Sequence, residues 1–173
     1  YADIAVTADI GSNFHNVKYV DESTNTLYLY GPKYWILRKD FYRYSEIGKP
    51  LPTEIRKIVL LFGGSDPANL TSETLKHLLK ARRPYHVDVV IGATFQHHAA
   101  LNGVLANSKD NPLTVVVHEN IANVAELMFA SDLVIASPGL SAFEALRVGT
   151  PVIVVPHDDL QKDTYVGVFS LLD

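Results

Sequence analysis

From residue 58 onward, short apolar runs alternate with longer segments in which apolar side chains recur every three or four positions. The short runs are apolar throughout, a pattern typical of parallel strands that are covered on both faces. The longer segments have the period of an α-helix. Strands are predicted at 58–62, 87–91, 113–117, 133–136 and 152–155, and helices at 72–81, 96–106, 121–129 and 141–148, with a last helix starting near residue 160.

Strands that alternate with helices in this way predict an α/β fold, with a doubly wound, Rossmann-like parallel sheet. In such sheets ligands bind beyond the carboxyl ends of the strands. The loops that could carry chemistry therefore begin at Gly63, Gly92, His118 and Ser137, and a further loop follows Val155.

Residues 1–50 do not follow this pattern. Strands are expected at 3–7 and 26–30, with a polar turn region at 13–25 between them. Residues 46–54, with two prolines and a glycine, are typical of a linker. The sequence therefore predicts a domain boundary near residue 50, with residues 1–50 as the remnant of a preceding domain plus a linker, and 51–173 as the Rossmann-like domain.

An aromatic-rich run before the linker is a candidate surface for self-association or for a partner subunit. It contains Tyr34, Trp35, Phe41, Tyr42 and Tyr44. The same run is also compatible with a helix that packs on a part of the protein absent from this chain.

The amino-acid composition of the chain argues against several classes of function. The 173 residues carry 15 basic and 19 acidic side chains, which argues against a nucleic-acid binder because such proteins need a basic face. No apolar run is long enough to cross a bilayer, so no membrane span is predicted, and a cytoplasmic location is expected. The absence of cysteine excludes a disulfide framework and a thiolate metal site. The chain starts at Tyr1 without a signal-peptide pattern, and we interpret it as part of a longer gene product.

The stretch LLFGGSDP places two glycines and a serine after the first strand of the regular region. Glycines allow a phosphate to approach the backbone, and the dipole of the following helix favours an anion. The stretch is neither a Walker A loop nor a G-x-G-x-x-G fingerprint. A tight turn without any ligand explains the spacing equally well.

The stretch SPGLSAFEAL contains Ser141 followed three residues later by Glu144. This spacing matches the S-x-x-E capping box, in which each side chain binds a backbone N–H at the start of a helix. Alternatively, the Glu144 carboxylate accepts two hydrogen bonds from a vicinal diol such as a ribose. The spacing alone favours the capping box.

The triplet at 157–159, His-Asp-Asp, resembles the acidic metal triplets of some sugar transferases. Its place after the last strand of a doubly wound domain does not fit that class. No metal site and no cofactor is predicted.

Three segments in this order, FGGSDP, VHENIANVAELMFASDLVIASPGLSAFEALRVGTPVIVVP and DLQKD, resemble the C-terminal nucleotide-binding half of two-domain GT-B glycosyltransferases. The resemblance is strongest to the UDP-sugar hydrolases of pseudaminic acid biosynthesis and their spore-coat polysaccharide relatives, and includes the segment GPKYWILRKDF. It is looser to the transferase that adds N-acetylglucosamine to the lipid-linked peptidoglycan precursor. The fold that this resemblance implies is a GT-B C-terminal domain, which binds a UDP-sugar.

The resemblance also implies roles for individual residues. Gly64 and Ser65 would face the phosphates, Asn120 and Ile121 would border the uracil, Gly139, Leu140 and Ser141 would hold the diphosphate, Glu144 would accept the ribose hydroxyls, and Gln161 would reach the sugar. Pro138 stands where family members commonly have glycine, which removes one N–H from the turn. The hydrolases' catalytic histidine lies in a glycine-rich loop that this chain lacks, so no catalytic residue is assigned.

The leading hypothesis is the UDP-sugar-binding portion of a nucleotide-sugar hydrolase or glycosyltransferase, acting in surface polysaccharide or nonulosonic acid biosynthesis. One alternative is an enzyme similar to UDP-N-acetylglucosamine 2-epimerase. Another is a truncated binding module without catalytic activity.

Overall fold

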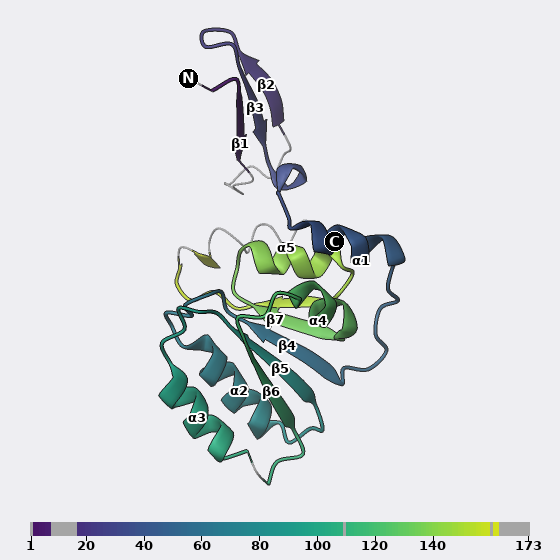
Figure 1. Ribbon diagram of the computed structural model, residues 1–173, viewed down its shortest axis with the longest axis vertical. Helices are drawn as coiled ribbons and strands as arrows, with labels where there is room; N and C mark the ends of the chain where they lie inside the picture. Colours follow the sequence, from purple (N-terminus) through teal and green to yellow (C-terminus); the bar gives the residue numbers. More distant parts are fainter. Residues whose placement is uncertain (1, 8–16, 109, 160, 163–173) are drawn as a thin grey trace. The chain divides into compact units, whose positions relative to one another are not determined.

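A computed structural model of the chain describes residues 2–7, 17–108, 110–159 and 161–162 (Figure 1). The chain divides into two compact units, one formed by Tyr1–Leu37 with Asp158–Asp173 and the other by Arg38–His157. The helix predicted from about residue 160 lies mostly outside the described residues. No helix in the described ranges is long and apolar enough to span a membrane.

The larger unit is built on a five-stranded sheet in which every strand pair is parallel. Its strands are β4 (Lys57–Leu61), β5 (His86–Ile91), β6 (Thr114–Glu119), β7 (Leu133–Ala136) and β8 (Val152–Val154), in the order β6-β5-β4-β7-β8. The predicted parallel α/β sheet is therefore confirmed. The chain builds the sheet outward from β4 in both directions, so the order reverses between β4 and β7, where doubly wound sheets bind ligands.

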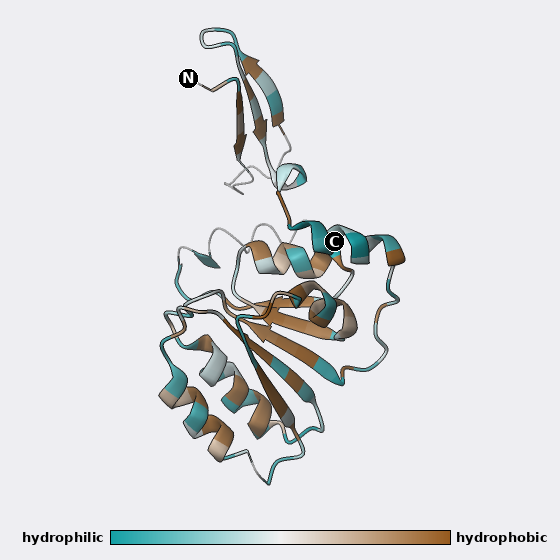
Figure 2. Cartoon of the chain, viewed as in Figure 1, coloured by the Kyte–Doolittle hydropathy of each residue, from teal (hydrophilic) through white to brown (hydrophobic). Residues whose placement is uncertain are grey.

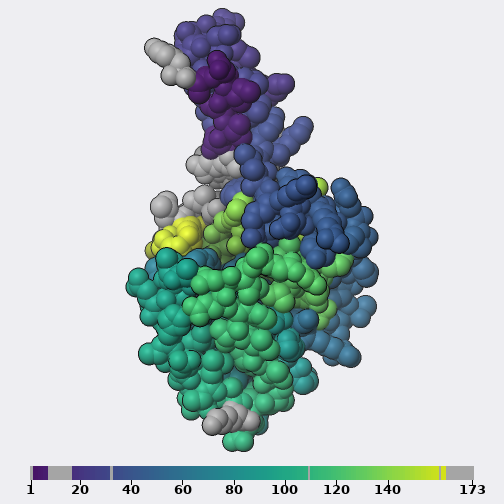
Figure 3. Space-filling model, viewed as in Figure 1, coloured from purple at the N-terminus to yellow at the C-terminus, as the bar shows by residue number. Residues whose placement is uncertain are grey.

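Helices cover both faces of this sheet (Figure 1). They are α1 (Lys39–Ile47), α2 (Leu70–Lys80), α3 (His98–Ala106), α4 (Val124–Ala130) and α5 (Leu140–Arg147). Alternate residues of β4 serve the two faces: Ile58 and Leu60 pack with α2 and α3, whereas Val59 packs with α1, α4 and α5. The strands are accordingly mostly apolar (Figure 2), and Figure 3 shows one face of the molecule in space-filling form.

The segment before the predicted linker packs on the larger unit. Phe41 of α1 is fully buried in the core on the α4 side of the sheet. Lys49 donates to the Ser131 carbonyl and, at 3.1 Å, to the Thr150 hydroxyl, and partial burial lowers the pKa of its ammonium group. The two compact units divide between Leu37 and Arg38, before α1, whereas the sequence predicted a boundary near residue 50. The sequence could not predict this division, because the local pattern does not show which sheet an amphipathic helix will cover. The aromatic run as a partner surface stays a prediction.

The smaller unit contains a three-stranded sheet, in the order β1-β3-β2. It consists of β1 (Ile4–Thr7), β2 (Val17–Asp21) and β3 (Thr26–Tyr30), followed by the short 3-10 helix η1 (Pro32–Tyr34). Strand β2 lies inside the region predicted to be a polar turn, so that prediction was wrong. Cross-strand contacts supply the stability that the sequence of β2 does not show: Tyr19 stacks on Tyr28 at 5.0 Å between ring centroids.

Candidate functional site

A pocket of about 400 Å³ lies at the carboxyl ends of β4, β5 and β6, beside the start of α5. Its volume is within the range of small-molecule sites, about 300–1,000 Å³. Five residues that the sequence analysis singled out line it together: Gly64, Asn120, Ile121, Ser141 and Glu144. The topology therefore brings three separate loops to the expected place.

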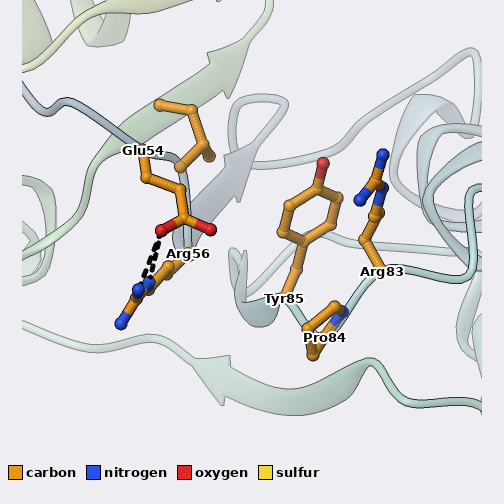
Figure 4. A pocket seen from close by; sticks show the side chains of 6 residues that line it. Glu54, Arg56, Arg83, Pro84 and Tyr85 are labelled. Carbon is orange, nitrogen blue, oxygen red and sulfur yellow. Dashed lines mark hydrogen bonds and ion pairs between the residues drawn. The ribbon is translucent and has the colours of Figure 1, made fainter.

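A larger hollow of about 660 Å³ opens at the opposite end, where β4 and β5 begin (Figure 4). Arg83 and Tyr85 line it together with Glu54, whose carboxylate accepts hydrogen bonds from Arg56 at 2.8 and 3.0 Å. This ion pair is largely exposed. Because doubly wound sheets bind ligands at the carboxyl ends of their strands, the smaller pocket is the candidate site despite its smaller volume.

The loop after β4 supplies backbone to the pocket. Asp66, almost completely buried, accepts hydrogen bonds from the N–H groups of Leu70 at 2.8 Å and Thr71 at 2.9 Å. Its carboxylate thus occupies the first turn of α2, which the sequence analysis had considered for phosphate. An anion beside Gly64 would have to meet the loop backbone instead.

A close backbone contact joins this loop to the loop after β5. A Cβ atom placed on Gly92 would lie 2.6 Å from the Gly64 Cα atom and 2.7 Å from its carbonyl oxygen. No side chain fits between the two loops, so glycine at Gly92 lets them meet behind the pocket.

The start of α5 differs from the predicted capping box. The N-cap residue is Gly139, with φ of 136°, and no side chain caps the helix. Ser141 lies inside the helix, and Glu144 pairs with Arg38 instead of a backbone N–H. The capping-box prediction was wrong because the helix starts at Leu140, directly after the N-cap Gly139. Ser141 is therefore the second residue of the helix and not its N-cap. The first N–H groups of α5 carry no side-chain cap and can meet an anion.

We expect Ser141→Ala to change the free energy of unfolding by no more than about 0.5 kcal/mol, since the hydroxyl caps nothing. Asp66→Ala is the matched comparison, because Asp66 does cap a helix, and its loss is expected to cost about 1 kcal/mol or more. Urea denaturation of both variants measures the difference. Equal losses in the two would contradict this account of α5.

Glu144 is the buried acid of the pocket. Its side chain is only 5% exposed, and Arg38 Nε donates to its Oε1 oxygen at 3.3 Å. Burial raises the pKa of the Glu144 carboxyl, and the nearby Arg38 guanidinium partly opposes this shift. The carboxylate is therefore held by one cation at the pocket wall, where it can accept hydrogen bonds from a ligand.

Arg38 is a site residue that the sequence analysis missed. Among the described residues lining the pocket it is the only cation. Its guanidinium lies over the Phe41 ring, 5.0 Å from the centroid, and beyond the Nε bond its terminal nitrogens have no partner among the described residues. Arg38 is separated by 106 positions from Glu144, so only its presence in the segment GPKYWILRKDF could have drawn attention to it.

The other predicted residues lie around or away from the pocket. Gly139 and Leu140 form the start of α5, and Leu140 is 39% exposed. Ser65 is exposed on the loop after β4. Gln161 belongs to the other compact unit, where its N–H donates to the Asp158 carboxylate at 2.7 Å, so its contact with a sugar stays a prediction.

Comparison with known proteins agrees with the resemblance that the sequence motifs indicated. Residues 58–165 match the family model described as the glycosyltransferase family 28 C-terminal domain. The chain is 45% identical over 168 residues to the uncharacterized protein MJ1062 of Methanocaldococcus jannaschii, covering 95% of this chain and 34% of that protein. It is 27% identical over 154 residues to the spore coat polysaccharide biosynthesis protein SpsG of Bacillus subtilis, covering 86% and 44%.

The chain thus spans about a third of the length of the first relative and less than half of the second. The family match covers most of the larger unit, including its sheet from Ile58 onward and the loops of the pocket after β4, β5, β6 and β7, but not Arg38. With this match and the parallel sheet, the chain belongs to the glycosyltransferase family 28 C-terminal domain family of the GT-B superfamily and is a nucleotide-sugar-binding module.

Proposed function

We propose that this chain is the UDP-sugar-binding portion of a nucleotide-sugar hydrolase or glycosyltransferase that acts in surface polysaccharide or nonulosonic acid biosynthesis. The family supports nucleotide-sugar binding, and the printed name of the Bacillus subtilis relative supports the polysaccharide context. The residues that resemble those of UDP-sugar hydrolases support UDP as the nucleotide.

One observation carries the proposal: a single pocket combines a buried carboxylate, a guanidinium whose terminal nitrogens have no partner among the described residues, and a helix start without a side-chain cap. A carboxylate pairs well with a vicinal diol, and a guanidinium or a helix N-terminus pairs well with a phosphate. A nucleoside diphosphate presents both groups a few bonds apart. The pocket therefore offers a partner for both the ribose diol and the diphosphate of such a ligand.

In this proposal Glu144 accepts hydrogen bonds from the ribose hydroxyls. The first N–H groups of α5 and the terminal nitrogens of Arg38 face the diphosphate. Asn120 and Ile121 border the base. When the bond between the sugar and UDP breaks, these donors stabilise the negative charge that develops on the departing diphosphate.

Calorimetric titration with UDP, with ADP as the control nucleotide, tests the proposal. We expect UDP to bind and ADP to bind more weakly, because the loop after β6 would contact the base. The titration is run on this chain and on a longer version that includes the flanking sequence of the same gene product. If neither binds UDP at millimolar concentration, the proposal fails.

Arg38→Met is expected to weaken UDP binding by about tenfold, in line with the loss of hydrogen bonds from a charged donor. Binding of uridine, which has no phosphate, is expected to change far less. Methionine retains an apolar contact over Phe41, so the free energy of unfolding serves as the control. An equal loss for UDP and uridine would instead indicate that Arg38 acts only by orienting Glu144.

A further inference from the structure

Asp88 is an unusual residue for its place in the fold. It lies in the middle of β5, between buried valines, and is 2% exposed. A carboxylate in such surroundings is costly unless a positive charge or hydrogen bonds compensate it. The sheet would be expected to carry an apolar side chain at this position.

Two histidines converge on one oxygen of this carboxylate. The Oδ1 atom lies 2.7 Å from His118 Nε2 and 3.4 Å from His86 Nε2. The Oδ2 atom is buried and has no hydrogen-bond partner in the part of the chain that the structure describes. The two imidazoles are partly exposed, 24% for His118 and 41% for His86, and can exchange protons with solvent. The described residues contain no group arranged to hold a metal ion.

The closer histidine stands next to the candidate site. His118 lies on β6, in register with Val90 of β5, and Val90 lines the pocket. Two residues further on, Asn120 has a φ of 52° and donates its N–H to the Ile91 carbonyl at 3.0 Å. Strand β6 is an edge strand that pairs only with β5. The place of the loop after β6 therefore depends on contacts between these two strands.

We propose that Asp88 and His118 form a positioning pair, in which the contact between His118 Nε2 and the buried Asp88 carboxylate fixes the loop that carries Asn120 and Ile121 at the pocket wall. Without this contact Asp88 keeps only the longer contact with His86, and the loop is held less firmly.

Other ionisable groups around the pair are placed differently. Lys57 shares the sheet face through its register with His86. On α4, which covers this face, Glu126 accepts a hydrogen bond from Asn123. Arg38 and Glu144 line the pocket and pair with each other. Of the groups on this face, only the two histidines contact the Asp88 carboxylate.

Amide hydrogen exchange of residues 119–122 tests the pair without any ligand. After correction for intrinsic rates, we expect exchange to be about fivefold faster in Asp88→Asn and in His118→Gln, which keep the approximate shapes and remove the carboxylate or the imidazole, than in the unchanged protein. His86→Gln is the matched control and should leave the exchange rate unchanged. Exchange in His118→Gln that is no faster than in the unchanged protein would overturn the proposal, as would equally fast exchange in His86→Gln.

Where a single variant does not fold, the double variant Asp88→Val with His118→Val replaces the pair by residues suited to the sheet. It is expected to fold, and its loop is expected to exchange faster than the loop of the unchanged protein. A loop that exchanges as slowly as in the unchanged protein would overturn the proposal.

The effect on the site rests on the proposed function. Asp88→Asn and His118→Gln should bind UDP about fivefold more weakly than the unchanged protein. Loop exchange that follows the prediction while the unchanged protein binds no UDP would contradict the proposed function and leave the positioning pair standing. Equal UDP affinities in these variants and in the unchanged protein, with binding intact, would overturn the link to the site.

Discussion

Glu144→Gln is expected to weaken UDP binding by about tenfold to a hundredfold, the usual value of hydrogen bonds to a charged acceptor. An amide keeps the shape of the carboxylate but loses the charge and one acceptor oxygen, so it cannot bind both hydroxyls of a diol. Stability is expected to change little at neutral pH, because Glu144 caps no helix and the Arg38 side chain that it pairs with is already 47% exposed to solvent. Calorimetry and urea denaturation measure the two effects separately.

The same variant has a predicted signature in the pH dependence of stability. Because burial raises the pKa of Glu144 in the folded state, the folded protein binds more protons than the unfolded chain from the ordinary value of 4.5 upward. This group therefore makes stability fall as the pH rises from 4.5 through the folded-state pKa. Glu144→Gln should remove that fall.

Glu119→Gln is the matched control for charge, since Glu119 is an exposed acid at the end of β6. It should change neither UDP affinity nor the pH dependence of stability appreciably. Intact UDP binding in Glu144→Gln would rule out the ribose contact. A large loss of stability in Glu144→Gln would indicate instead that Glu144 has a purely structural role.

Gly92→Ala is expected to lower the free energy of unfolding by about 1–3 kcal/mol, as overpacking does in a tight site. The new methyl group would meet backbone atoms of Gly64, and backbone cannot move aside as a flexible side chain can. The loop after β4 must shift, so UDP binding is expected to weaken as well. Thermal or urea unfolding and calorimetry with UDP measure the two losses.

Gly64→Ala is the control, because it adds a methyl group to the other glycine of this contact. Its Cβ atom would meet only the Thr94 hydroxyl oxygen, at the ordinary distance of 3.5 Å. Stability should therefore change little, and any loss of UDP affinity would report on a phosphate that approaches the Gly64 backbone. Similar destabilisation by both substitutions would show that the loops are not held together at Gly92.

The core of the fold could be predicted because it rests on local patterns. The apolar runs at β4, β5, β6, β7 and β8 and the helical periods between them follow from burial on both faces of a parallel sheet. Strand β2 was missed because its stability comes from a partner strand. The place of α1 was missed because the burial of Phe41 is a long-range contact.

The candidate site, like the fold, could be predicted from the sequence only in part. The ends of the predicted strands marked the loops, the family resemblance assigned Gly64, Asn120 and Glu144 in them, and the pocket brings these residues together. Arg38 was not assigned a role, since its ion pair with Glu144 joins residues 106 positions apart. Asp88 was not singled out and His118 was noted only as the start of a loop, because their pairing depends on the register of β5 and β6.

The sequence by itself determined the parallel α/β architecture and the loops where a ligand would bind, because hydrophobic period and glycine placement are local properties of the chain. Only the tertiary structure decided what Glu144 does. Spacing made it a capping acid, but the helix starts at Leu140 and the carboxylate meets Arg38 at the pocket. The reason is physical: a side chain's partners depend on which segments the fold places beside it, and that information is distributed over the whole chain.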